Sequence, residues 1–177
     1  MMKTTLKFGA LPWLMALLTT VALNISPQAS AVNDIALEDT AGKMQRLDQY
    51  IGQGKWVVLN IWGPGCPPCR EEMPDLVRFH DKHVEHDAMV VGIAIDFPGY
   101  GYADKTKVIE FAEEYLIDFP LLLSDASISE RLGLGMLQGL PTTYIYSPEG
   151  EVVGMQVGAI TEKILDNFLR KKQRAIK

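Results

Sequence analysis

The two cysteines of the chain, Cys66 and Cys69, are separated by only two residues, in the stretch WGPGCPPCREEMP over 62–74. A disulfide that closes so short a loop constrains the unfolded chain little, because loop-closure stabilisation grows with loop length. The sequence has no other cysteine to link either residue to another part of the fold. The spacing therefore favours reversible thiol–disulfide chemistry over a structural crosslink.

The two prolines between the cysteines limit which backbone groups can stabilise a thiolate. Neither Pro67 nor Pro68 has a backbone N–H, so the nearest backbone donor for the Cys66 sulfur is Cys69. Pro68 suits the first turn of a helix, and it holds Pro67 toward an extended conformation. We predict a stiff loop in which Cys66 is the attacking thiol and Cys69, inside the first turn, is the resolving thiol.

Metal binding is the alternative use of such a pair. Structural zinc takes about four ligands, and the chain has no second cysteine pair. His80, His83 and His86 recur every three residues, so we expect them on the solvated surface of the predicted helix and predict no metal site. Two thiolates suit Cu(I), which leaves a Cu(I) carrier open as an alternative.

The cysteine pair needs elements that hold it at one edge of a sheet. Two nearly continuous apolar runs, 56–62 and 88–95, predict buried strands. Right-handed crossovers would bring Cys66 and Asp96 to the same sheet edge. Strands alternating with helices predict an α/β fold, with a central mixed sheet flanked by helices on both faces and an N-terminal β-hairpin extension. The other predicted strands are 35–39, 43–47, 121–123, 142–146 and 151–156, and the predicted helices are 68–85, 105–115, 127–132 and 161–172.

The first 31 residues have the pattern of a secretory signal peptide. Two lysines precede an apolar run over 8–25, and Ala29-Ser30-Ala31 supplies the small residues of a cleavage site. We place cleavage after Ala31, which leaves 32–177 as one periplasmic domain. An uncleaved membrane anchor is the alternative, because about 18 apolar residues can just span a bilayer.

The charge balance excludes some partners. The chain has 17 basic and 22 acidic residues, which argues against a nucleic-acid partner, since such proteins need a basic footprint. The glycines of Gly133-Leu134-Gly135 follow a predicted helix rather than a strand, so they do not indicate a nucleotide site. We expect a monomer whose only redox group is the Cys66–Cys69 disulfide.

Two segments resemble a known family. Residues 57–74, VVLNIWGPGCPPCREEMP, resemble the active-site stretch of thioredoxin-like proteins and are most similar to the exported TlpA, ResA and DsbE group. About 70 residues later, GLPTTYI at 139–145 resembles the cis-proline loop of that family. The resemblance extends from 35 to about 172 and implies a thioredoxin-like fold.

The resemblance also implies a site and an activity. It implies thiol–disulfide exchange with protein substrates at Cys66 and Cys69, with Pro141 in cis beside the pair. The predicted substrate groove consists of Leu140, whose backbone would pair with the substrate, Trp62, placed below the active loop, and Thr142. The group includes proteins that reduce apocytochrome c thiols, so the resemblance favours a reductase supplied by a membrane electron donor of the DsbD type. A disulfide-donating oxidase is the alternative, because such pairs span about −270 to −120 mV.

Some positions depart from the thioredoxin pattern. Asn60 stands where thioredoxins carry a buried acid that accepts the proton of the resolving thiol. We predict Asp96 as the acceptor instead, from its strand-end position, with Glu71 and Glu72 as further candidates; an ordinary turn carboxylate is an equal alternative for Asp96. Gly65 replaces a second tryptophan of thioredoxin, so we expect a more open site.

Overall fold

A computed structural model describes Met1 and residues 32–175 of the chain, so the predicted leader lies outside the described residues apart from Met1. The described residues form one seven-stranded mixed sheet with the strand order β2-β1-β5-β4-β3-β6-β7. The strands are β1 Ala36–Asp39, β2 Met44–Arg46, β3 Trp56–Trp62, β4 Ala88–Ala94, β5 Leu121–Leu123, β6 Thr142–Tyr146 and β7 Val152–Val157. The helices are α2 Pro67–His83, α3 Lys105–Tyr115, α4 Ile128–Arg131 and α5 Glu162–Ala175, with a 3-10 turn at Leu47–Gln49. Every predicted strand and helix is present, with ends shifted by up to three residues.

The centre of the sheet brings three chain segments to one edge. Strand β3 is buried along its whole length and pairs in parallel with β4, with Trp62 opposite Ala94. Strand β6 pairs antiparallel with β3 on its other side, with Thr142 opposite Ile61. The ends of β3 and β4 and the start of β6 therefore share an edge, as predicted for Cys66 and Asp96.

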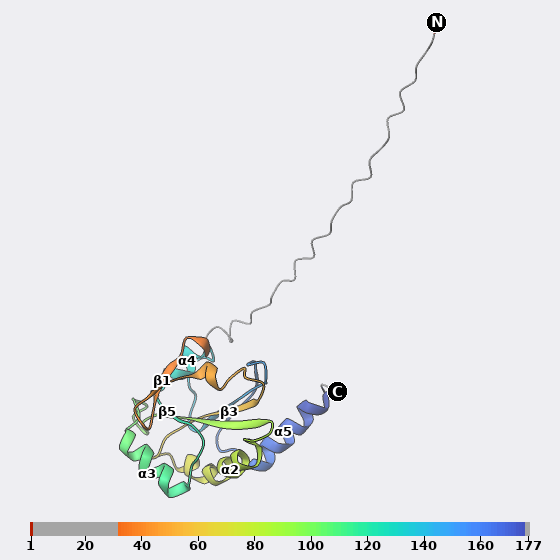
Figure 1. Cartoon of the computed structure of the whole chain (residues 1–177). Coiled ribbons are helices and arrows are strands. Elements are labelled where there is room, and N and C mark those ends of the chain that lie inside the picture. The colour runs from red at the N-terminus through yellow and green to blue at the C-terminus, as the bar shows by residue number, and fades with distance from the viewer. Residues whose placement is uncertain (2–31, 176–177) are drawn as a thin grey trace.

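Helices cover both faces of this sheet, which confirms the predicted architecture (Figure 1). Alternate residues of a strand point to opposite faces. Val58 and Trp62 therefore pack in a core cluster with residues of α2, α3 and α5. Leu59 and Ile61 pack in a second cluster with the 3-10 turn and α4. None of the described helices is long and apolar enough to cross a membrane.

The prediction that the histidines lie on a solvated face is wrong for His80. Its side chain is buried, because this part of α2 packs against β4. The Nδ1 atom of His80 accepts a hydrogen bond of 3.0 Å from the backbone N–H of Val90. The ring also lies beside that of Phe119, with centroids 5.6 Å apart. His80 is therefore part of the packing between helix and sheet.

Candidate active site

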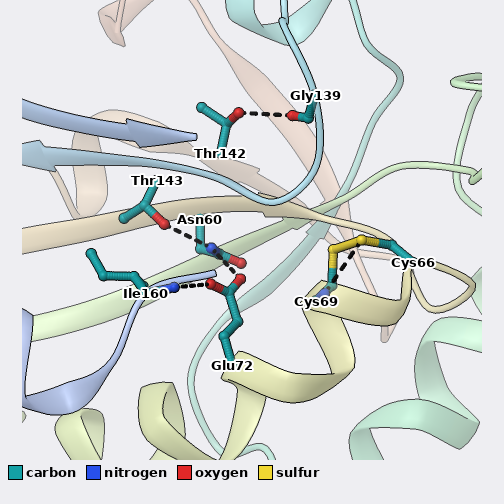
Figure 2. Close-up of a disulfide and its surroundings, with 8 residues drawn as sticks. All are labelled: Asn60, Cys66, Cys69, Glu72, Gly139, Thr142, Thr143 and Ile160. Atoms are coloured by element: carbon teal, nitrogen blue, oxygen red, sulfur yellow. Dashed lines mark hydrogen bonds between the residues drawn. A yellow bond between two sulfur atoms is a disulfide. The ribbon is translucent and has the colours of Figure 1, made fainter. Parts of the chain in front are cut away.

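The cysteine pair lies at the start of α2, just after the short loop that follows β3. Cys66 and Cys69 form a disulfide, and Cys66 is the N-cap of α2, with an extended backbone. Pro67 and Pro68 are the first two residues of the helix, so the prediction of an extended Pro67 is wrong; the extended residue is Cys66. The backbone N–H of Cys69 donates to the Sγ atom of Cys66 over 3.3 Å, as the absence of proline N–H groups predicts (Figure 2). Both cysteines are almost completely buried in this oxidised state.

The loop before β6 lies at the same edge of the sheet. The Leu140–Pro141 peptide bond is cis, as the resemblance implied. The hydroxyl of Thr142 donates to the carbonyl of Gly139 over 2.8 Å (Figure 2), and the carbonyl of Pro141 accepts from the N–H of Gly158 over 2.8 Å. These bonds hold the cis-proline loop at both ends, while the side chain of Leu140 is half-buried. Its place in a substrate groove stays a prediction.

Two residues assigned to the groove cannot line it with their side chains. Trp62 and Thr142 are both fully buried. The ring of Trp62 lies on the sheet face that packs against α2, α3 and α5, and it contacts Phe111, with ring centroids 4.7 Å apart. Trp62 therefore supports the site from below, as expected, and Thr142 fixes the shape of the cis-proline loop, so the groove assignment is wrong for these two side chains.

Among the residues that the structure describes, Glu72 is the only buried acid, and it lies about one turn after Cys69 on α2. It follows Cys69 by three residues, so both lie on one face of α2. One carboxyl oxygen accepts from the amide of Asn60 over 2.9 Å, and the other accepts from the backbone N–H of Ile160 over 2.9 Å (Figure 2). Burial raises the pKa of Glu72 from its ordinary 4.5 to about 7, against the lowering effect of these two hydrogen bonds. A carboxyl with such a pKa can gain or lose a proton at neutral pH.

Asn60 joins this carboxyl to the sheet. Its amide nitrogen donates both to Glu72 and, over 3.0 Å, to the hydroxyl of Thr143 (Figure 2). A buried carboxyl thus enters the site from α2, next to the strand position where thioredoxins carry their acid. The burial of Glu72 could have been predicted from the sequence, because Glu72 shares a helix face with Cys69, Met73 and Leu76.

Asp96 occupies a different environment from Glu72. It is half-buried at the end of β4, and its backbone closes a loop by donating to Gly101 and accepting from Tyr100. Its role as proton acceptor remains a prediction. Glu72 has the stronger case, since it combines burial, fixed hydrogen bonds and a pKa near neutrality.

The expectation that Gly65 leaves a more open site stays a prediction: Gly65 is exposed and lines a pocket, although the backbone after β4 passes close to it. A Cβ atom at this position would lie 2.9 Å from the carbonyl oxygen of Phe97. At Gly63, a Cβ atom would lie 2.8 Å from the carbonyl oxygen of Ile95. The backbone after β4 therefore lies where it would crowd a Cβ atom at either position, and the two glycines permit this close approach.

Comparison with known proteins agrees with this geometry. The model of the AhpC/TSA family matches residues 29–155. The chain belongs to the AhpC/TSA family. Within this thioredoxin-like family it is similar to the thiol–disulfide oxidoreductase ResA of Bacillus subtilis, with 30% identity over 147 residues, covering 82% of the chain and 75% of ResA. For ResA of Halalkalibacterium halodurans the identity is 29% over 140 residues, covering 78% of the chain and 73% of that protein.

Comparison with solved structures gives the same fold. A DsbF homologue from Corynebacterium diphtheriae has a TM-score of 0.67 and 25% identity, covering 79% of the chain and 85% of that structure. A thioredoxin-family thiol:disulfide interchange protein from Chlorobium tepidum has a TM-score of 0.66 and 23% identity, covering 77% and 91%, and shows the shared fold. The protein is accordingly a thiol–disulfide oxidoreductase of the ResA and DsbE type, with Cys66 and Cys69 as its cysteine pair.

Proposed function

We propose that this family member is an exported reductase that transfers electron pairs from the Cys66–Cys69 dithiol to disulfides in proteins. The observation that carries the proposal is the disulfide at the start of α2, at one sheet edge with a cis proline, together with the buried carboxyl of Glu72. The pair supplies two electrons and the carboxyl supplies a place for one proton.

The proposed reaction has two exchange steps. The Cys66 thiolate attacks one sulfur of the substrate disulfide, a mixed disulfide forms, and the other substrate sulfur leaves as a thiolate. Cys69 then gives its proton to Glu72 and attacks the Cys66 sulfur. The second substrate sulfur leaves as a thiolate, so the substrate gains two electrons and the protein ends with the Cys66–Cys69 disulfide.

The remaining parts of the proposal concern where the protein works and what returns its electrons. The signal-like pattern of the first 31 residues supports export to the periplasm. The disulfide itself is the redox group, so the oxidised protein needs an electron donor, and a membrane reductase of the DsbD type would regenerate the dithiol. The protein would act as a monomer. Similarity to ResA supports a role close to cytochrome c maturation.

The reduction potential of the pair tests the direction of transfer. We expect the purified protein, equilibrated in glutathione or dithiothreitol buffers, to give a value of about −250 mV or below. A value near about −130 mV would mean a strongly stabilised Cys66 thiolate and a disulfide-donating role instead. Stoichiometric Cu(I) binding without any thiol turnover would favour the carrier alternative.

A further inference from the structure

A pocket of about 360 Å³ opens directly beside the cysteine pair and has no role in the exchange steps above. It lies between the loop before α2, the loop after β4 and the side of α3. Pro64 and Gly65, the two residues before Cys66, form part of its wall. Its position therefore places whatever fills it beside the segment that leads into Cys66.

The cations of this pocket are already paired. Arg70 makes an ion pair of 2.7 Å with Glu114, and its guanidinium lies over the rings of Phe111 and Tyr115. Lys107 lies 3.7 Å from the carboxylate of Asp104. An incoming anion would have to compete with these carboxylates, so the pocket does not favour an acidic ligand.

Two carboxylates remain after this pairing. Asp96 and Glu110 both line the pocket, and among the described residues neither takes part in an ion pair. The lining also includes the apolar residues Ile95, Phe97 and Phe111. Lysine and arginine side chains match such a surface, because they bury an aliphatic stem and keep the charged end beside polar groups.

The sheet order decides how a substrate would reach the pocket. The strands run β4-β3-β6, so the pocket flanks the disulfide on the β4 side and the cis-proline loop flanks it on the β6 side. A polypeptide bound across both would place a residue close to its reacting cysteine over Asp96 and Glu110. We propose that this pocket binds a basic side chain near the reacting cysteine of the polypeptide substrate. The inference rests on the proposed function and specifies its substrate class.

Short peptides test this inference. Each carries one cysteine, activated as a mixed disulfide with the same neutral thiol, and has Lys, Gln or Glu within two residues of that cysteine. The rate constant for attack by the reduced protein is measured at low and high salt. At low salt we expect the Lys peptide to react about five- to tenfold faster than the Glu peptide, with Gln between them, and high salt should shrink the difference.

Two lysine substitutions on α3 separate the pocket from general charge effects. Glu110→Lys should abolish or reverse the preference for the Lys peptide. Glu113→Lys makes the same change of charge on the same helix, but Glu113 does not line the pocket, so the preference should remain. Glu110→Gln is a milder change that should reduce the preference. It tests the same residue if the lysine variant does not fold.

The outcomes distinguish the inference from the proposal beneath it. Equal rates for the three peptides, or equal effects of the two lysine variants, would overturn the pocket inference and leave the oxidoreductase intact. If the reduced protein attacks none of the peptides, the proposed function fails, and the inference fails with it.

Discussion

At the scale of single residues, Glu72 is the side chain whose surroundings most change the expected chemistry. An acid in a dry, apolar setting holds its proton more tightly, because burial penalises the charged form. Here the bonds from Asn60 and Ile160 hold the carboxyl in place, while burial raises its pKa to about 7. The residue can thus be neutral or ionised under physiological conditions.

Glu72→Gln should change how stability depends on pH. The folded-state pKa of about 7 lies above the ordinary 4.5, so between these values the folded protein binds more protons than the unfolded chain. The free energy of unfolding contributed by Glu72 therefore falls as pH rises through this window, by up to about 3 kcal/mol. Denaturant unfolding of the oxidised protein should be measured at several pH values. Between pH 5 and pH 8, the free energy of unfolding of the variant should rise relative to that of the wild type by up to about this amount.

The same variant has a kinetic signature if Glu72 accepts the proton of Cys69. Glutamine cannot take that proton, so the resolving step should slow by about 10²-fold and the mixed disulfide with substrate should accumulate. Quenched-flow mass measurement would detect the mixed disulfide. If the two proteins show parallel stability curves and the same rate for the resolving step, Glu72 is not the proton acceptor, and Asp96 becomes the leading candidate.

At the scale of elements, the loop after β4 shapes the site as much as the cysteine loop does. The Phe97 carbonyl lies where it would crowd a Cβ atom at position 65. The same loop supplies Asp96 and Phe97 to the pocket beside Cys66. The segments after β3 and β4 therefore pack as one unit at the edge of the sheet.

Gly65→Ala tests this packing. The added methyl group would meet backbone rather than a movable side chain, so we expect a loss of about 1–3 kcal/mol of stability. Gly101→Ala is a matched control in the loop after β4, because a Cβ atom there meets nothing within 4 Å; it should change stability by about 0.5 kcal/mol or less. Equal unfolding midpoints for the two variants would show that the loop after β4 moves enough to accommodate the added methyl group at little cost.

At the scale of the whole molecule, the residues just after the predicted cleavage site already belong to the core. Val32 and Ile35 are both buried in the cluster beneath α4 and the 3-10 turn. A chain cut after Ala31 would therefore keep every described residue that packs in this cluster.

The mature protein should begin at Val32. Intact-mass measurement of the protein released from the periplasm checks this, because cleavage after Ala31 gives a single defined mass. Recovery of the full-length mass in the membrane fraction would show instead that the leader stays as an anchor. A chain shortened to begin at Ala36 should lose about 2–5 kcal/mol of stability, since it lacks two buried aliphatic side chains.

The sequence by itself determined the elements and the reactive pair. The apolar run at 56–62, the two-residue spacing of Cys66 and Cys69, and the prolines between them are local patterns, and the chemistry and backbone constraints that they impose act over a few residues. The motif around Pro141 added the family and the cis bond. These features could be predicted because no distant contact is needed to specify them.

Only the tertiary structure decided which acid is buried, which way Trp62 faces and what lies close to Gly65. The pKa of Glu72 depends on burial and on a bond to Ile160, 88 residues away in the chain. His80 and Trp62 are buried because α2 and α3 pack onto one face of the sheet. Such effects come from desolvation and close packing between segments far apart in sequence, so no local pattern could specify them.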